Sequence, residues 1–81
     1  MTKTLQVQYF AILREQRGLA REKIPTTAAT AREFYEELRG RHGFTLTADR
    51  LRVAVNDEFA SWEAPLKEGD SLVFIQPVAG G

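Results

Sequence analysis

The chain has 81 residues, of which 43% are hydrophobic and 27% charged, and this composition fits one small globular domain. A chain of this length buries only about 60% of the surface that its unfolded form exposes, so its small core has no room for a deep internal active site. Eleven Lys and Arg residues balance eleven Asp and Glu residues. Because nucleic-acid binding depends on an excess of positive charge, we expect no nucleic-acid partner.

Cysteine is absent from the sequence, which excludes disulfides, thiolate metal sites and cysteine nucleophiles. The first residues, Met1 to Thr4, lead directly into a strand pattern and contain no apolar stretch typical of a signal peptide. No segment approaches the roughly 18 apolar residues that a membrane helix needs. We therefore expect a cytoplasmic protein that has no membrane-spanning segment.

The first third of the chain predicts two strands separated by a helical turn. Residues 5–9 alternate apolar and polar side chains, the pattern of a half-buried strand. Residues 10–18 change period and end at a glycine, which indicates a short helical turn. Residues 21–24 form a weaker, polar strand, and we expect Pro25 and the threonines after it to end it.

The main helix is predicted to begin after Thr30. Thr30 and Glu33 have the spacing of a capping box, in which each side chain binds the other residue's free backbone amide. Gly40 and Gly43 offer a stop near the end of the helix. Apolar residues recur at i, i+3 and i+7 and form one buried stripe: Ala31, Phe34 and Leu38.

The last part of the chain predicts two further strands. After a polar connection at 45–50, residues 51–55 alternate as a strand, and 56–58 turn the chain into a short segment at 59–62. A tight turn at 67–70 leads into the last strand, 71–76. Its side chains divide between two faces, Leu72 and Phe74 on one and Val73 and Ile75 on the other.

The order of two strands, a helix, and two or three more strands favours an α+β fold. A mixed sheet wrapped across one main helix is the economical way to bury Phe34 and Leu38, and this arrangement is the ubiquitin-like β-grasp. Pro77 has no amide proton with which to continue a strand. We therefore expect a β-grasp domain at 1–77 and a flexible C-terminal tail at 78–81.

The sequence offers no set of residues for catalysis. His42 is the only histidine, and a solvated helix end explains it. Glu36 and Glu37 are adjacent, so they do not face one another on a helix as an acid–base pair. No phosphate-binding or dinucleotide-binding fingerprint is present. We expect no catalytic residue, no metal site and no bound cofactor, and hence no enzyme activity of the chain by itself.

The end of the sequence, Val78-Ala79-Gly80-Gly81, suggests a chemical role. A terminal carboxylate is ionised at neutral pH and can attack the phosphorus of ATP, which gives a reactive acyl adenylate. A sulfur nucleophile can then displace AMP and leave a thiocarboxylate on Gly81. Gly80 has no Cβ, which allows the backbone to enter a narrow channel. A frayed, inert terminus is the plain alternative.

Three apolar residues fall out of phase with the buried positions of their strands: Phe10, Phe59 and Ile75. If they share the outer face of the sheet near the tail, they form a patch suited to a partner. The alternative is that the small core wraps around them. The pattern favours an interface for Phe10 and Ile75, leaves Phe59 open, and places Trp62 in the core or as a cover of the sheet.

Four groups of residues match the pattern of one known family. The first three are Val7, Tyr9, Phe10, Ala11, Arg14, Glu15 and Gly18; Ala54, Val55 and Asn56; and Leu66, Gly69 and Asp70. The last and most specific group runs from Phe74 and Ile75 through Pro77 to Gly81; Gln76 stands where many members have a second proline. Over almost its whole length, the sequence thus resembles the small, sulfur-carrying subunits of molybdopterin synthase. The thiamine-pathway sulfur carrier shares the fold and the Gly-Gly end.

The resemblance implies a reaction cycle carried out with partner proteins. An E1-like adenylyltransferase would activate Gly81 with ATP and Mg²⁺, and a sulfurtransferase or cysteine desulfurase would supply sulfur. The tail, with Ala79 and Gly80, would enter the active site of the large subunit of molybdopterin synthase, within a heterotetramer. There the sulfur would be given to the pyranopterin precursor of the molybdenum cofactor. The contacts implied with the large subunit are those of Phe10, Phe59, Ile75, Pro77 and Val78.

Three other functions remain open from the sequence. The sulfur could serve thiamine synthesis or transfer RNA thiolation. The same adenylate could instead join Gly81 to a lysine, as in a ubiquitin-like protein modifier. A β-grasp interaction domain with an inert end is the simplest possibility.

Overall fold

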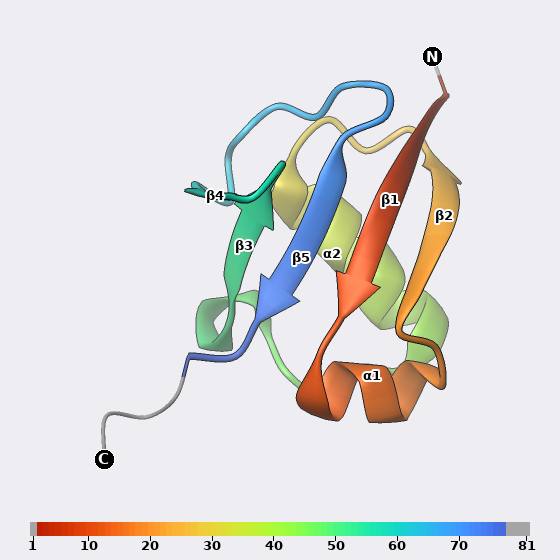
Figure 1. The fold of residues 1–81 in the computed structure, drawn as a ribbon, viewed down its shortest axis with the longest axis vertical. Helices are drawn as coiled ribbons and strands as arrows, with labels where there is room; N and C mark the ends of the chain where they lie inside the picture. Colours follow the sequence, from red (N-terminus) through yellow and green to blue (C-terminus); the bar gives the residue numbers. More distant parts are fainter. Residues whose placement is uncertain (1, 78–81) are drawn as a thin grey trace.

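The computed structural model describes residues 2–77. The strands form one five-stranded sheet in the order β2-β1-β5-β3-β4, and α2 crosses one face of it (Figure 1). β1 and β5 are parallel, whereas the other neighbours are antiparallel. This is the predicted β-grasp. The elements in chain order are β1 (Lys3–Tyr9), α1 (Ala11–Arg17), β2 (Arg21–Thr26), α2 (Ala31–His42), the 3₁₀ turn η1 (Ala48–Arg50), β3 (Arg52–Val55), β4 (Glu58–Ala60) and β5 (Ser71–Ile75).

The core lies between α2 and the inner face of the sheet. The predicted stripe of α2 is fully buried, and Tyr35, which the pattern did not include, is buried with it. The ring of Tyr35 lies 5.0 Å from that of Phe74 on β5. Trp62 stacks on Phe74, at 5.9 Å between centroids, and also lies 5.7 Å from the ring of Tyr35, so it covers the core as predicted.

The predicted start of α2 is confirmed, with a variation in its cap. The Thr30 side chain accepts a hydrogen bond from the Glu33 amide, as in a capping box. The Glu33 carboxylate, however, accepts from the amide of Ala29 rather than from that of Thr30. Gly43 ends the helix with a φ of 71°, a left-handed conformation that glycine adopts without a steric cost. Gly40 lies within the helix.

A loop that follows β4 also holds the start of α2. The amide of Ala31 donates to the carbonyl of Ala64, and the amide of Arg32 donates to that of Trp62. Together with the Thr30 cap, these bonds satisfy the first amides of the helix, which otherwise lack partners. The loop and the helix therefore form one rigid unit on the inner face.

The second strand passes through Pro25 and ends at Thr26, so it is two residues longer than the predicted 21–24 and ends at the first of the threonines expected to end it. The amide of Tyr9 donates to the carbonyl of Ala20, which sets the alternation of hydrogen bonds between β1 and β2. By that alternation, Ile24 and Thr26 bond to β1, whereas Pro25 faces the open edge of the sheet. An edge position needs no amide donor, so proline is tolerated there.

The structure also corrects the prediction of a solvated His42. Its side chain is only 13% exposed and packs against the ring of Phe44, 5.5 Å away. The segment at 45–50, predicted as a polar connection, contains a short 3₁₀ turn with Ala48 buried. Both Phe44, just before this segment, and Ala48 within it are buried in the core. The ring of Phe44 covers the end of α2.

Two turns shape the second half of the sheet. Asn56 and Asp57 have φ values of 53° and 71°, as a two-residue hairpin between β3 and β4 requires. Gly69 has a φ of 84° in the turn before β5. β5 ends at Ile75, one residue before the predicted end, and no helix within residues 2–77 is long and apolar enough to cross a membrane.

Candidate functional site

The face of the sheet opposite α2 carries an apolar band. The strand registers pair Val73 with Ala54, and Ala54 with Phe59, so these residues form one row across β5, β3 and β4. Ile75 lies two residues beyond Val73 on the same face of β5. Ala54 is only 8% exposed although it does not belong to the inner core, because its neighbours on the outer face cover it. We call Val73, Ala54, Phe59 and Ile75 the apolar band.

Phe59 is the most exposed large apolar residue among those that the structure describes, at 66%. The guanidinium of Arg52 lies over its ring, 5.8 Å from the centroid. Arg52 pairs with Ile75 across β3 and β5, so it faces outward with the band. The ring is therefore held on the surface and is not folded into the core.

Phe10 lies beside the end of the band. It is 46% exposed and occupies the N-cap position of α1, directly after β1. The parallel register pairs Tyr9 with Phe74, so Phe10 and Ile75 are the next residues along the two strands. The sequence expectation that Phe10, Phe59 and Ile75 lie on the outer side of the sheet agrees with this geometry.

The chain leaves the sheet at the end of the apolar band where Phe10 and Ile75 lie. Ile75 is the last residue of β5, and Pro77, which is exposed, is the last residue that the structure describes. The band therefore reaches the point from which the chain continues toward its end (Figure 1). The other predicted site residues, Val78, Ala79, Gly80 and Gly81, lie outside the described residues.

A polar cluster lies on the opposite, inner side, around the carboxylate of Glu22. It accepts hydrogen bonds from the Tyr9 hydroxyl at 2.8 Å and from Arg17 at 2.7 Å and 2.9 Å. The hydrogen bonds from Arg17 lower the pKa of Glu22, and burial raises the pKa of Tyr9. The cluster joins β1, α1 and β2 and is turned away from the apolar band, so its role is structural.

His42 adds a fourth element to this cluster. Its Nε2 lies 3.9 Å from the Glu22 carboxylate, and burial lowers the pKa of its side chain. Within residues 2–77 no three His, Cys, Asp or Glu side chains gather as a group that could hold a metal ion.

Comparison with known proteins identifies the family of this chain. Residues 7–81 match the ThiS family, so the match includes both the band and the Gly-Gly end. This chain belongs to the ThiS family. Two relatives extend the match over nearly the whole chain. Proteins called "molybdopterin synthase sulfur carrier subunit" from Haemophilus influenzae and Escherichia coli are 32% and 30% identical to it over 80 residues, which is 95% of this chain and 99% of each relative.

Solved structures of similar proteins agree with the family assignment. A Pyrococcus furiosus protein described as putative molybdopterin converting factor, subunit 1, is 31% identical and has a TM-score of 0.79, with 94% of this chain and 99% of that chain covered. The complex of subunits 1 and 2 of the Helicobacter pylori molybdopterin-converting factor contains a chain that is 25% identical, with a TM-score of 0.64 and coverage of 96% and 99%. The resemblance noted from the sequence is thus confirmed for the family and the fold.

Three residues of the outer face were not singled out from the sequence as site residues: Arg52, Ala54 and Val73. The alternation of β5 did place Val73 opposite Leu72 and Phe74. Arg52 and Ala54 alternate in the same way with Val53 and Val55 on β3. What the sequence does not show is that β3 and β5 are neighbours, which joins these positions into one surface.

Proposed function

We propose that this ThiS-family chain is the sulfur carrier subunit of a molybdopterin synthase. The observation that carries the proposal is the end-to-end relationship to two proteins of that name, with 99% of each relative covered. An apolar band on the outer face, in which Phe59 is 66% exposed, reaches the exit of the chain from the sheet and supports the proposal, because such a face suits docking beside a reactive tail.

The chemistry of the carrier takes place at the carboxylate of Gly81. An oxygen of this carboxylate attacks the α-phosphorus of ATP, pyrophosphate leaves, and a glycyl adenylate forms. Hydrosulfide then attacks the glycyl carbonyl carbon, AMP leaves with the former carboxylate oxygen, and a proton is released from the sulfur. The product is a C-terminal thiocarboxylate. ATP and Mg²⁺ belong to the activating partner, and this chain contributes the acyl group.

The partners follow from the same proposal. An E1-like adenylyltransferase acts on Gly81, a sulfurtransferase or cysteine desulfurase provides sulfur, and the large subunit of the synthase receives it, all in the cytoplasm. Phe10, Phe59 and Ile75 contact the large subunit, and both Phe10 and Phe59 are exposed in the free chain. Pro77 and Val78 continue this contact toward the tail.

The tail then enters the active site of the large subunit. Ala79 and Gly80 pass through the entrance, where their small size leaves clearance for the backbone. The thiocarboxylate sulfur reaches the pyranopterin precursor there. In this proposal the catalytic groups for that transfer belong to the large subunit.

Intact-mass measurement tests the proposal. The chain is incubated with a purified activating enzyme, ATP, Mg²⁺ and sulfide, and we expect a mass gain equal to one exchange of oxygen for sulfur. Deletion of Gly81 should abolish the gain, whereas Phe59→Ala should leave it in place if Phe59 serves the large subunit. An unchanged mass with an enzyme that loads another carrier would contradict the proposal, and an adduct with lysine-bearing proteins would indicate a protein modifier instead.

A further inference from the structure

The outward-facing charged side chains of the sheet all have one sign, whereas the inner side carries both signs, since Lys3 of β1 lies there with the acidic strand residues. The strand residues that face outward include three charged side chains, and all three are basic: Arg21, Lys23 and Arg52. The acidic strand residues Glu22 and Glu58 pair with Val7 and Val55, which face the inner side. This distribution occurs in a chain whose charges sum to zero. The outer face is therefore a local region of positive charge.

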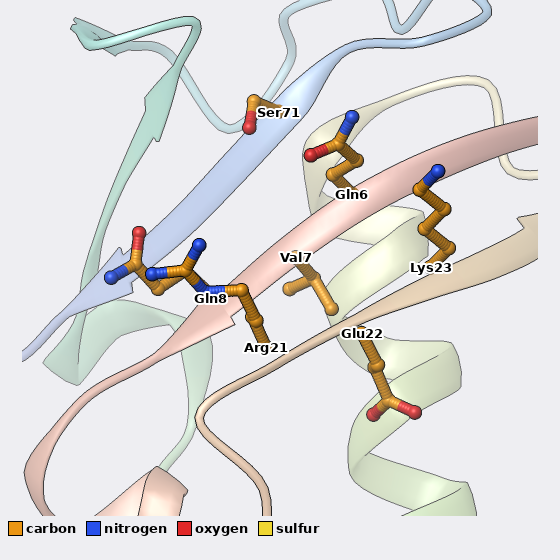
Figure 2. Close-up of a pocket in the computed structure, with 7 residues that line it drawn as sticks. All are labelled: Gln6, Val7, Gln8, Arg21, Glu22, Lys23 and Ser71. Atoms are coloured by element: carbon orange, nitrogen blue, oxygen red, sulfur yellow. The ribbon is translucent and has the colours of Figure 1, made fainter.

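Two of these cations line an open groove over β1 and β2 (Figure 2). The groove has a volume of about 260 Å³. Arg21 pairs with Gln8, and Lys23 pairs with Gln6, so two cations and two amides stand in adjacent rows. Among residues 2–77, neither Arg21 nor Lys23 takes part in an ion pair. We call the outward-facing side chains that line it the basic groove: Gln6, Gln8, Arg21, Lys23 and Ser71.

The basic groove and the apolar band form one continuous surface. Gln8 pairs with Val73, so the row that begins at Arg21 on β2 continues through Gln8 and Val73 to Ala54 and Phe59. Arg52 provides a third cation on the far side, over Phe59. The surface thus has an apolar centre with positive charge on both sides.

We propose that this outer face selects a protein partner whose apolar patch is bordered by carboxylates, with one acidic group received by the basic groove and another by Arg52. Complementary charge of this kind raises the rate of association and fixes the register of the two surfaces. A small anion is a poorer fit because the groove is open and its cations are exposed, without the enclosure that a small-molecule site needs. The inference rests on the proposed function, since it describes the large subunit's side of the same interface.

A second role of the same charges has to be separated from docking. β2 is an edge strand, and lysine on an edge strand discourages pairing with other chains. Replacement of Arg21 and Lys23 by glutamate keeps the edge charged while it reverses the sign. Charge reversal therefore changes an electrostatic interface but leaves the protection of the edge in place.

The test is a titration of the large subunit of molybdopterin synthase with the loaded chain at low and high salt. We expect Arg21→Glu/Lys23→Glu to weaken binding on the order of tenfold at low salt, mainly through slower association, and high salt to reduce the difference. Arg41→Glu/Lys67→Glu is the matched control. It changes the net charge equally at exposed positions on α2 and in the turn before β5, outside the outer face.

The outcomes separate the two proposals. Loss of affinity in the groove variant, with normal affinity in the control and normal sulfur loading of Gly81 in both, supports the acidic partner. Equal affinity of both variants and the unmodified chain overturns it and leaves the carrier function standing. Absence of sulfur loading in the unmodified chain overturns the carrier function itself. Equal weakening of both variants also overturns the inference, because net charge would then explain the effect.

Discussion

Arg52 on β3 and Phe59 on β4 form a cation–π pair on the outer face of the sheet, with 5.8 Å between the guanidinium carbon and the ring centroid. The two residues are diagonal neighbours, because Phe59 itself pairs with Ala54. The pair keeps a large apolar ring at the surface in one orientation. A partner that buries this ring gains an anchor whose position is already fixed, which lowers the cost of ordering it.

Replacement of Phe59 by alanine should therefore affect binding and leave folding intact. The side chain is 66% exposed, so we expect the free energy of unfolding to change by less than about 0.5 kcal/mol. We expect the affinity for the large subunit to fall about tenfold or more, as for a buried aromatic anchor. Urea unfolding measures the free energy of unfolding, and calorimetric titration measures the affinity for the large subunit. Leu19→Ala, an exposed apolar residue outside the sheet, is the control, and equal affinity for Phe59→Ala would refute the assigned contact.

Removal of the N-terminal cap of α2 should change only the stability of the fold. Thr30→Ala deletes the acceptor of the Glu33 amide, and the expected cost is about 1 kcal/mol of unfolding free energy. Thr27→Ala is a matched control, because Thr27 is exposed and its side chain makes no hydrogen bond within residues 2–77. Urea denaturation of the two variants makes the comparison. Equal stabilities would show that the loop bonds to Ala31 and Arg32 hold the helix start without the cap.

Glu22 should make stability depend on pH in the acid range. Its pKa is lowered in the folded chain by hydrogen bonds from Arg17, so its contribution is present above the unfolded value near 4.3 and is lost as pH falls through the folded pKa. We expect Glu22→Gln to cost about 1–3 kcal/mol at neutral pH, because buried partners lose a charged acceptor. The cost should shrink as the solution is acidified.

Unfolding curves collected from neutral to acid pH test this expectation. Glu36→Gln is the control, because Glu36 is 47% exposed and its ion pair with Arg39 is long, at 3.7 Å. A difference between Glu22→Gln and the unmodified chain that stays constant with pH would contradict the assigned role of the Glu22 charge.

The two tyrosines should limit stability at alkaline pH. Burial raises the pKa of Tyr35 to about 12 and raises that of Tyr9 further. Since both folded values exceed the unfolded value near 10, stability is complete below that pH and falls as pH rises above it. We expect phenolate absorbance to appear only together with loss of the folded circular dichroism signal. The chain has just these two tyrosines, so Tyr35→Phe should halve the absorbance change, and a midpoint near 10 in folded protein would contradict burial of the phenols.

Local sequence patterns predicted most of the helices and strands, but they did not show which strands lie next to one another in the sheet. The alternation of Leu72 and Phe74, and the spacing of Thr30 and Glu33, report on adjacent backbone and were confirmed. The second strand was predicted two residues too short at Pro25, because only the sheet order shows that β2 is an edge strand, where a proline is tolerated. The burial of His42 was missed because it depends on the chain folding back after α2, which places Phe44 against its ring, and on Glu22 of β2 lying beside it.

The candidate site shows the same limit. Phe10, Phe59 and Ile75 were found from the sequence because a large apolar residue out of phase with its strand is visible locally. Arg52 and Arg21 carry no such signal, since an arginine at an outward strand position is ordinary. Their meaning depends on the strand registers, which show that every charged strand residue on the outer face is basic.

The place of β5 in the sheet has a consequence for biosynthesis. The last strand is the central one, inserted between β1 and β3, so the earlier part of the chain supplies two flanking pairs of strands that are not hydrogen-bonded to each other. The outer face is therefore incomplete until residues 71–75 have left the ribosome and paired with both neighbours. A nascent chain, or one truncated before residue 71, presents no continuous surface to a partner. Assembly is thereby restricted to chains that have been synthesised through the strand that leads to Gly81.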